Sequence, residues 1–318
     1  MFVLDSHCDT PTQILRGRDL SKDNEFAHID IPKLRQGGVD AAFFALYIPA
    51  DLDVDSAYEC ALAQYEAVKE MIESNSDSVA FASSEAQAYE NKAAGKFSVF
   101  LGLENGSPIG HSLDRVKEFY DKGVRYMTLC HSMDNQICDS CAGNNTWGGL
   151  SPFGREVVAE MNRLGMLVDV SHISDNAFFD VLGCSSQPVV ATHSCCRALA
   201  DHPRNMTDDM IKALAAKGGV MQINFYPVFL QDEYELESPA SVIPSYTRIA
   251  DHIDHLVELV GIDHVGIGSD FDGIEVAPCG LEDISKMPVL LDELRRRGYS
   301  EVDLAKLASG NFFSVLSC

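Results

Sequence analysis

The stretch Leu4-Asp5-Ser6-His7-Cys8-Asp9-Thr10 continues a short apolar run, Phe2-Val3-Leu4, close to the amino terminus. The apolar run predicts a buried strand that ends in His7-x-Asp9. Residues two apart on a strand point to the same side, so this imidazole and this carboxylate are expected to enter one cavity. A neutral His nitrogen and an Asp oxygen together suit a zinc-type ion. The alternative is that these residues cap a turn. The positions of the other polar residues along the chain distinguish the two interpretations.

Candidate strands recur along the chain and alternate with segments of helical periodicity. The eight expected strands are Phe2–Ser6, Val39–Ile48, Lys96–Leu103, Val124–Leu129, Gly165–Val170, Pro188–Thr192, Gly219–Phe225 and His264–Gly268. The expected helices are Ala57–Ser74, Leu113–Lys122, Pro152–Leu164, Ser174–Leu182, Thr207–Lys217, Pro244–Val260 and Ile284–Arg297. Two irregular stretches, Asp134–Leu150 and Pro227–Ser245, are expected to be loops over one face.

This alternation predicts the fold class. The strands are mostly continuous in apolar residues, which is typical of parallel strands covered on both faces. Eight strands alternating with helices predict an α/β fold with a single domain, residues 1–318, built as a (β/α)8 TIM barrel. A doubly wound open sheet is the alternative, but such a sheet usually carries a Gly-rich phosphate turn, and we find none in the sequence.

Composition narrows the classes of partner. The chain has 318 residues and a formal net charge of −24. This acidity argues against nucleic acid and against anionic membrane surfaces, since both require basic patches. No apolar run is long enough to span a bilayer, and no secretory leader is recognisable before the first strand. The ten cysteines are scattered, as free thiols in a reducing cytoplasm are, so a cytoplasmic protein is predicted.

One pair of cysteines has a spacing that occurs in metal sites and in redox sites. Cys138-x-x-Cys141, with Cys130 nearby, has the spacing of half a structural zinc site or of a redox pair. No second pair follows at zinc-finger spacing, which favours a loop with incidental cysteines. Trp147, in a Gly-rich part of the same loop, is either a lid contact or a packing residue.

Polar residues stand where the predicted strands end. In a barrel the carboxyl ends of all strands share one mouth, and the chemistry of this fold is found there. A turn or a cap explains any one of these residues but not the whole set. In strand order the residues are His7 and Asp9, Glu104, His131, His172, His193 and Asp270.

These donors exceed what one tetrahedral zinc takes, which suggests two ions. A shared carboxylate can bridge two ions with a hydroxide between them. Two divalent ions bring four positive charges, and Asp9, Glu104 and the hydroxide return three of them. The net positive centre would polarise a carbonyl and keep water deprotonated at neutral pH. The residues alone therefore predict binuclear, metal-assisted hydrolysis.

Six motifs occur in a fixed order along the chain. They are Asp5-Ser6-His7-Cys8-Asp9-Thr10, Gly102-Leu103-Glu104, Thr128-Leu129-Cys130-His131, Leu150-Ser151-Pro152-Phe153-Gly154-Arg155-Glu156, Val168-Asp169-Val170-Ser171-His172 and Gly268-Ser269-Asp270-Phe271-Asp272-Gly273. As an ordered set, from about residue 2 to residue 316, they resemble the renal (membrane) dipeptidase family of the amidohydrolase superfamily. Without a leader or a lipid-anchor tail, the chain is expected to be similar to the soluble bacterial members.

The resemblance implies a ligand set for two Zn²⁺ ions. His7 and Asp9 would bind one ion, and His172 and His193 would bind the other. Glu104 would bridge the two.

The resemblance also implies roles at the substrate. His131 would reach the substrate carbonyl and stabilise the oxyanion. Asp270 would contact the bridging water and pass its proton to the leaving amine. Arg204, eleven residues after His193, matches the family arginine that binds the free carboxylate, a task suited to a planar guanidinium. Tyr226 either lines the pocket or packs in the core.

We therefore predict a zinc-dependent dipeptidase that cleaves dipeptides with a free C-terminal carboxylate. By the resemblance, a D-residue is accepted at the second position, and the chain forms a homodimer. The alternatives are another binuclear amidohydrolase acting on a non-peptide amide, and a catalytically inactive barrel that binds peptides or metal.

Four residues near these motifs receive other predictions. His252 and His255 are expected on the solvated outer face of a helix, although their spacing would also permit chelation. Asp272 is expected to be a turn residue, and Asp169 to orient the loop before His172.

Overall fold

The computed structural model describes residues 1–232, 234–236, 238 and 241–316. Within these residues one sheet contains nine strands. The strands are β1 (Leu4–Cys8), β2 (Ala41–Tyr47), β3 (Val79–Phe81), β4 (Phe97–Glu104), β5 (Val124–Thr128), β6 (Leu167–Asp169), β7 (Val190–Ser194), β8 (Val220–Ile223) and β9 (Val265–Ile267). Each of the eight predicted strands overlaps one of these.

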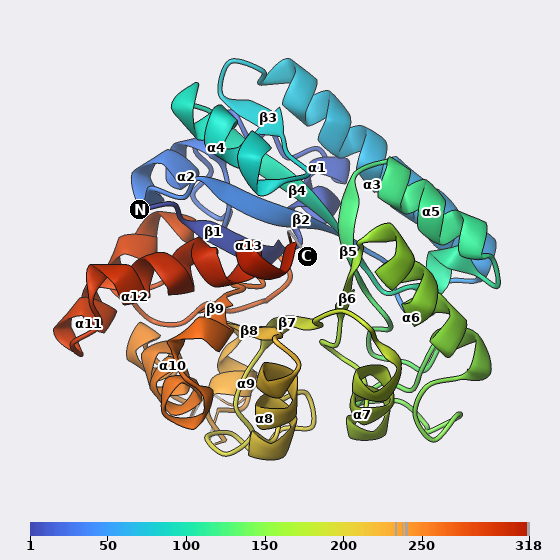
Figure 1. Ribbon diagram of the computed structural model, residues 1–318. Helices are drawn as coiled ribbons and strands as arrows, with labels where there is room; N and C mark the ends of the chain where they lie inside the picture. Colours follow the sequence, from blue (N-terminus) through green and yellow to red (C-terminus); the bar gives the residue numbers. More distant parts are fainter. Residues whose placement is uncertain (233, 237, 239–240, 317–318) are drawn as a thin grey trace.

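Eight of the strands form a nearly closed parallel barrel in the order β1-β2-β4-β5-β6-β7-β8-β9, with helices around it (Figure 1). The ring closes just beyond β1 and β9. There the Asp9 N–H donates to the Phe271 carbonyl at 2.9 Å, and the Asp270 N–H donates to the His7 carbonyl at 3.0 Å. The predicted α/β (β/α)8 barrel is confirmed.

Strand β3 lies outside the ring and was not predicted. It pairs with the first part of β4, where Val79 faces Phe97, before β5 takes over that edge. Three residues that end in the exposed Phe81 are too few to show a strand period.

Thirteen α-helices lie within the described residues. They are α1 (Thr10–Leu15), α2 (Ile31–Gly37), α3 (Val54–Ser74), α4 (Glu85–Ala93), α5 (Leu113–Asp121), α6 (Pro152–Leu164), α7 (Asp175–Cys184), α8 (Asp208–Ala216), α9 (Pro227–Leu230), α10 (Tyr246–Val260), α11 (Met287–Arg296), α12 (Glu301–Ala305) and α13 (Asn311–Leu316). The short turns are η1 (Ser107–Ile109), η2 (Ile262–His264), η3 (Ile284–Lys286) and the π-helical η4 (Lys306–Gly310).

The seven predicted helices are present, six of them with shifted ends, and α6 has the predicted bounds because its end signals are in the sequence. The Ser151 hydroxyl accepts from the Gly154 N–H at 2.8 Å, and Pro152 opens the first turn. Gly165 ends the helix with φ +78°, a conformation that glycine adopts without a Cβ penalty. One loop prediction was partly wrong, because Pro227 starts the short helix α9 inside 227–245. Residues 233, 237, 239 and 240 of that stretch lie outside the described residues.

An apolar plug closes the amino-terminal end of the barrel. Phe312 and Phe313 of α13, which crosses the ring in Figure 1, pack against Phe2, Phe43 and Phe100. The ring centroids of Phe43 and Phe312 are 5.1 Å apart. The polar strand ends lie at the opposite, carboxyl-terminal end, where barrels of this type hold their active sites.

Two features bear on the expected surroundings of the protein. Among the described residues we find no helix with both the length and the apolar character that a bilayer crossing requires. The cysteines between Cys8 and Cys279 are free thiols.

The structure also bears on the pair Cys138 and Cys141. Cys138 is buried, and no cysteine belongs to the groups of metal-ligating side chains found in the described part of the chain. The alternative of incidental cysteines in this loop is therefore favoured.

Candidate metal centre

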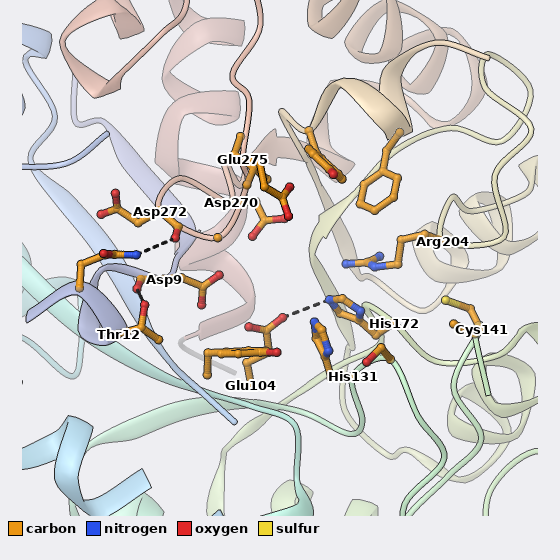
Figure 2. Close-up of a pocket in the computed structure, with 18 of the residues that line it drawn as sticks. Asp9, Thr12, Glu104, His131, Cys141, His172, Arg204, Asp270, Asp272 and Glu275 are labelled. Atoms are coloured by element: carbon orange, nitrogen blue, oxygen red, sulfur yellow. Dashed lines mark hydrogen bonds and ion pairs between the residues drawn. The ribbon is translucent and has the colours of Figure 1, made fainter. Parts of the chain in front are cut away.

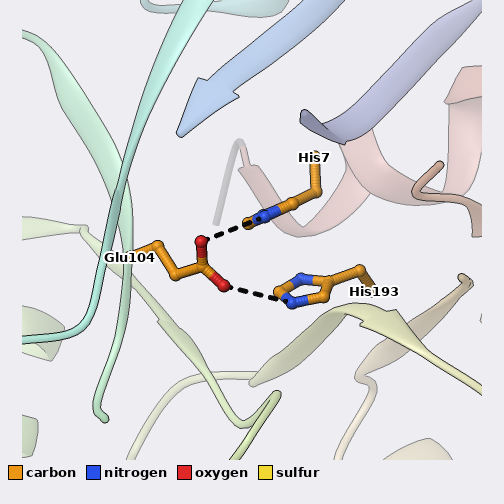
Figure 3. A group of neighbouring side chains, drawn as sticks. All are labelled: His7, Glu104 and His193. Atoms are coloured by element: carbon orange, nitrogen blue, oxygen red, sulfur yellow. Dashed lines mark ion pairs between the residues drawn. The ribbon is translucent and has the colours of Figure 1, made fainter. Parts of the chain in front are cut away.

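The strand register places the polar residues on one level. Glu104 is paired with Thr128, and Thr128 with Asp169, at the carboxyl ends of β4, β5 and β6. His7 on β1 and His193 on β7 reach the same end of the barrel. The structure thus brings together all seven polar residues predicted from the strand ends (Figures 2 and 3).

Glu104 lies at the centre of this cluster and points both carboxylate oxygens at imidazoles (Figure 3). Its Oε2 is 3.4 Å from His7 Nε2. Its Oε1 is 3.1 Å from His172 Nε2 and 3.3 Å from His193 Nε2. One carboxylate therefore has a separate set of nitrogen donors at each oxygen, which is the arrangement required of a bridging ligand.

Asp9 and His131 complete the donor set. His7, Asp9 and Asp270 form a group whose donor atoms lie within 4.8 Å of one another, and Glu104, His131 and His172 form another. His131, which the resemblance assigns to the substrate carbonyl, thus also lies within reach of an ion.

The chemistry of these residues fits a metal. His7 Nε2, Asp9 Oδ1 and Glu104 Oε2 are buried and make no hydrogen bond within the described residues. Buried polar atoms are normally paired, and each unpaired one is costly. Burial also lowers the pKa of His172 and His193 well below the usual range, which favours the neutral imidazole that a cation requires.

Protein contacts hold two of the imidazoles from behind. His7 Nδ1 lies 2.8 Å from the buried Tyr126 hydroxyl on β5. His193 Nδ1 lies 2.8 Å from the Thr192 hydroxyl. In both rings Nε2 is left to face the centre. Neither Tyr126 nor Thr192 was predicted, since a tyrosine or threonine inside a strand reads as ordinary strand composition.

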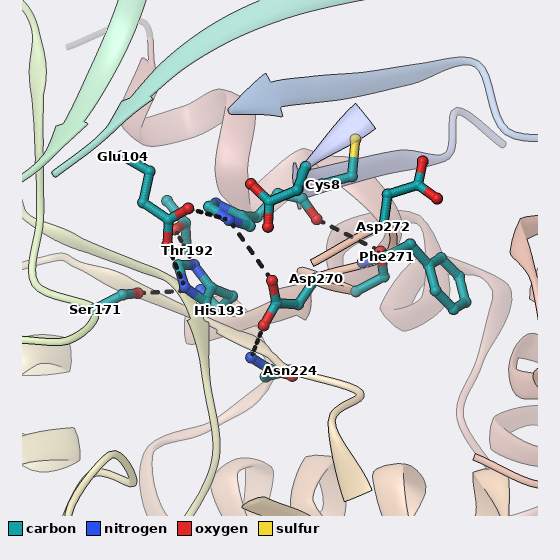
Figure 4. Close-up of polar contacts among 12 residues, drawn as sticks. Cys8, Glu104, Ser171, Thr192, His193, Asn224, Asp270, Phe271 and Asp272 are labelled. Carbon is teal, nitrogen blue, oxygen red and sulfur yellow. Dashed lines mark hydrogen bonds and ion pairs between the residues drawn. The ribbon is translucent and has the colours of Figure 1, made fainter. Parts of the chain in front are cut away.

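Asp270 lies beside the cluster (Figure 4). Its Oδ1 is 3.8 Å from His7 Nε2, and its Oδ2 accepts from the Asn224 amide at 2.8 Å. Burial raises the pKa of Asp270 to about 6. The carboxylate is therefore oriented by Asn224 and can exchange a proton near neutral pH.

A cavity of about 480 Å³ opens over the cluster (Figure 2). Its lining includes the predicted Asp9, Glu104, His131, His172, Arg204, Tyr226 and Asp270. The volume is in the range of small-molecule sites. Tyr226 thus lines the pocket, and its ring also packs on Phe229 at a centroid distance of 5.0 Å.

Arg204 is buried against the wall of this cavity. Its Nη1 donates to the Ser194 hydroxyl at 2.9 Å, and its Nη2 donates to the His193 carbonyl at 2.7 Å. Its Nε is buried without a partner, and none of the ion pairs among the described residues includes it. A buried cation of this kind is suited to an anion from outside the chain.

The structure corrects one prediction and extends another. His252 is buried, not solvated, because its Nδ1 accepts from the Cys196 N–H at 3.0 Å and its Nε2 lies 3.1 Å from the Leu230 carbonyl. His255 contacts Asp208 instead, so the pair does not chelate. Asp272 stands in a turn as expected, with φ +68°, and it also pairs with Arg18 at 2.6 Å.

The barrel and the donor cluster at its mouth together define a metal-dependent hydrolase. The family model described as membrane dipeptidase (peptidase family M19) matches residues 1–318. Dipeptidase verJ of Clonostachys rogersoniana is 36% identical over 301 residues, which cover 91% of this chain and 75% of the relative. Dipeptidase aclJ of Aspergillus oryzae is 37% identical over 312 residues, which cover 95% and 72%.

Solved structures agree with these matches. The probable dipeptidase PvdM of Pseudomonas aeruginosa superimposes with a TM-score of 0.92 at 26% identity, covering 99% of this chain and 94% of that one. A metallopeptidase from Rhodobacter sphaeroides, bound to a phosphinate mimic of L-Ala-D-Ala, superimposes with a TM-score of 0.91 at 28% identity, covering 100% and 99%. The chain belongs to the membrane dipeptidase family, peptidase family M19, and is a metallo-dipeptidase.

Proposed function

We propose that the chain is a zinc-dependent dipeptidase in which His7 and Asp9 hold one Zn²⁺ ion and His172 and His193 hold a second. Glu104 is proposed to bridge the two. The observation that carries this proposal is the position of Glu104, whose two oxygens face His7 on one side and His172 and His193 on the other. Bound zinc supplies Lewis acidity, which polarises the scissile carbonyl and acidifies water.

The proposed substrates carry a free C-terminal carboxylate. Arg204 is the residue assigned to it, because the residue is only 6% exposed, lines the cavity and has no carboxylate partner among the described ion pairs. Its contacts with Ser194 and His193 hold the guanidinium plane in place. A fixed guanidinium gives the charge-assisted hydrogen bonds that recognise carboxylates.

His131 and Asp270 are assigned to the reaction itself. Burial lowers the pKa of His131, so its ring is neutral at pH 7, and its Nδ1 makes no hydrogen bond within the described residues. A neutral imidazole can donate one hydrogen bond to the oxygen that becomes negative during attack. Asp270 would take the proton of the attacking water at Oδ1, since Oδ2 is occupied by Asn224, and would pass this proton to the leaving amine.

Acceptance of a D-residue at the second position is part of the same proposal. It is supported by the Rhodobacter sphaeroides metallopeptidase, whose ligand is a mimic of L-Ala-D-Ala. Tyr226 is proposed to contact the substrate, since it lines the cavity with Arg204. A cytoplasmic location is supported by the free thiols of the described cysteines, and the homodimer remains a prediction that light scattering can test.

A metal assay joined to a dipeptide panel tests the function. Purified protein is expected to contain two zinc ions per chain by elemental analysis. It should hydrolyse L-Xaa-L-Xaa and L-Xaa-D-Xaa dipeptides and lose this activity with a chelator. The same dipeptides with an amidated C-terminus should lose most of their kcat/KM if Arg204 binds the carboxylate. Equal turnover of acid and amide would contradict that assignment, and zinc-free activity would contradict the whole proposal.

A further inference from the structure

A buried carboxylate behind the metal centre has no role in the function described so far. Asp169, at the end of β6, is fully buried and accepts four hydrogen bonds. Its Oδ1 accepts from the backbone N–H groups of Ser171 at 3.0 Å and Thr192 at 2.9 Å. Its Oδ2 accepts from the hydroxyls of Thr128 at 2.6 Å and Thr192 at 2.7 Å. The carboxylate thus joins β5, β6 and β7 behind His193.

These contacts determine the direction of the next hydrogen bond. A threonine hydroxyl has one proton, and that of Thr192 is donated to Asp169. The contact of 2.8 Å between Thr192 Oγ1 and His193 Nδ1 must therefore be donated by His193. A neutral imidazole with its proton on Nδ1 carries its lone pair on Nε2. That atom is the one that faces Glu104 Oε1 at 3.3 Å.

We propose that Asp169, acting through the hydroxyl of Thr192, is a positioning residue that sets the tautomer of His193. The pair keeps the Nε2 lone pair of His193 directed at the metal centre. The backbone of His193 is held separately, because its N–H donates to the Ser171 hydroxyl at 3.2 Å (Figure 4). This inference rests on the proposed function only where it takes His193 as a zinc ligand.

A single isosteric substitution reverses the direction of the hydrogen bonds that join Asp169, Thr192 and His193. In Asp169→Asn, the two backbone N–H groups at the Oδ1 position still require an acceptor, so the amide oxygen stays there. The amide NH₂ then takes the Oδ2 position and donates to the hydroxyls of Thr128 and Thr192. The Thr192 proton becomes free to point at His193 Nδ1, which favours the tautomer protonated on Nε2. The lone pair required for zinc is lost although the shape of the site is kept.

Two matched variants separate hydrogen bonding from packing. Thr192→Val keeps the side-chain volume and removes the hydroxyl, so His193 Nδ1 loses its acceptor. Thr192→Ser keeps the hydroxyl and removes a methyl group. If Thr192 positions His193, the Thr192→Ser variant keeps the Nδ1–H tautomer of His193 that the Thr192→Val variant loses. If packing alone matters, the two variants behave alike.

The test has a spectroscopic arm and a metal arm. Histidine labelled with ¹⁵N in the zinc-free protein, at about pH 8 where imidazole is neutral, reports the tautomer of each ring by NMR. The His193 signals are identified by their loss in His193→Gln. We expect Nδ1–H in the wild type and in Thr192→Ser, a mixture in Thr192→Val, and Nε2–H in Asp169→Asn. Competition with a chromogenic chelator should show zinc binding weakened by about 10- to 100-fold in Asp169→Asn and near normal in Thr192→Ser.

The results of these two experiments either support or overturn the role of Asp169 in setting the tautomer of His193. An Nδ1–H tautomer in Asp169→Asn, or zinc affinity equal to that of the wild type, overturns the proposal. If Asp169→Asn does not fold, an unchanged single tautomer in Thr192→Val overturns it instead. If the wild type shows the Nδ1–H tautomer but binds no zinc, the proposed function fails while the role of Asp169 in setting the tautomer stands.

Discussion

Gly273 follows the strand-end segment that carries Asp270, and replacing it with alanine should disable the metal centre without unfolding the protein. A Cβ atom built on Gly273 would lie 1.9 Å from Asp9 Oδ2 and 2.8 Å from Asp270 Oδ1. The position itself is exposed, so the methyl group meets no packed core. The two atoms it meets belong to the proposed zinc ligand Asp9 and the proposed proton carrier Asp270.

The size of the required movement sets the size of the effect. Real Cβ atoms essentially never approach another heavy atom closer than 3.0 Å. The Asp9 carboxylate must therefore move away by about 1 Å or more, beyond the range in which a steric contact can be tolerated. A displacement of this size in a reacting or ligating group costs about 100-fold in rate. We expect kcat/KM to fall by about 100-fold and zinc at the His7–Asp9 position to bind at least about 10-fold more weakly.

The assay compares Gly273→Ala with a glycine that is free of neighbours. Gly183, within α7, has nothing within 4 Å of its built Cβ, and its φ does not require glycine. Gly183→Ala should therefore keep activity and gain about 0.5–1 kcal/mol of stability, as alanine does in a helix. Both variants are measured for kcat/KM, for zinc content and for the midpoint of thermal unfolding.

A Gly273→Ala variant that keeps two zinc ions and more than about a third of the wild-type kcat/KM would contradict this prediction, because the geometry demands a far larger loss. A large fall in the midpoint of thermal unfolding of Gly273→Ala would also contradict the prediction. That result would show that the methyl group displaces the backbone, not the Asp9 carboxylate.

Three further predictions concern single carboxylates. Glu104→Ala should lose activity together with most of the bound metal, and unchanged zinc content would contradict a bridging role. Asp270→Asn should keep its metal but reduce kcat by about 10²- to 10⁴-fold, the usual value of a positioned acid or base, whereas near-normal turnover would exclude the shuttle. Burial raises the pKa of Asp5 to about 6 in the folded protein. The protonated carboxyl group therefore stabilises the fold below about pH 4, and this stabilisation is lost as the pH rises to about 6. Asparagine cannot lose a proton, so the free energy of unfolding of Asp5→Asn should rise by about 3 kcal/mol relative to that of the wild type between about pH 4 and 7. Urea denaturation of the zinc-free proteins measures this difference, and a difference that does not change with pH would contradict the raised pKa.

The barrel could be predicted because its strands and major helices carry strong local signals. Most ring strands contain or continue an apolar run, and α6 has a serine cap, a first-turn proline and a terminal glycine in the sequence itself. Most of the elements that were not predicted are short. Strand β3 has three residues, and the helices α1, α2, α9, α12 and α13 have four to seven. These lengths are too short for a periodicity to appear. Helix α4 has nine residues and was also missed, because it buries only Ala88 and so carries no apolar stripe.

The donor set was predictable for a related reason. A barrel brings every strand end to one mouth, so a polar residue at a strand end has a known destination even when its partners are far along the chain. His252 shows where such local reasoning fails. Its helical position suggested solvent, but the Cys196 N–H and the Leu230 carbonyl, both distant in sequence, enclose it. Tyr126 was not predicted, and Asp169 was predicted only to orient the loop before His172, which its hydrogen bond from the Ser171 N–H supports. Only the folded barrel places these two residues behind an imidazole.

The backbone conformation at the mouth explains why this site depends on parts of the chain that look featureless. His172 has φ +71°, in the left-handed region, which costs a non-glycine residue about 1 kcal/mol or more. This conformation lets His172 Nε2 reach Glu104 from the end of a strand of only three residues, β6. The cost is offset by the loop that follows β5, where the Cys141 N–H donates to the His172 carbonyl at 2.8 Å and the Ser140 hydroxyl lies 3.3 Å from the same oxygen. The stretch Asp134–Leu150, which in sequence is merely irregular, thus holds a metal-facing histidine in a backbone conformation it would not adopt alone.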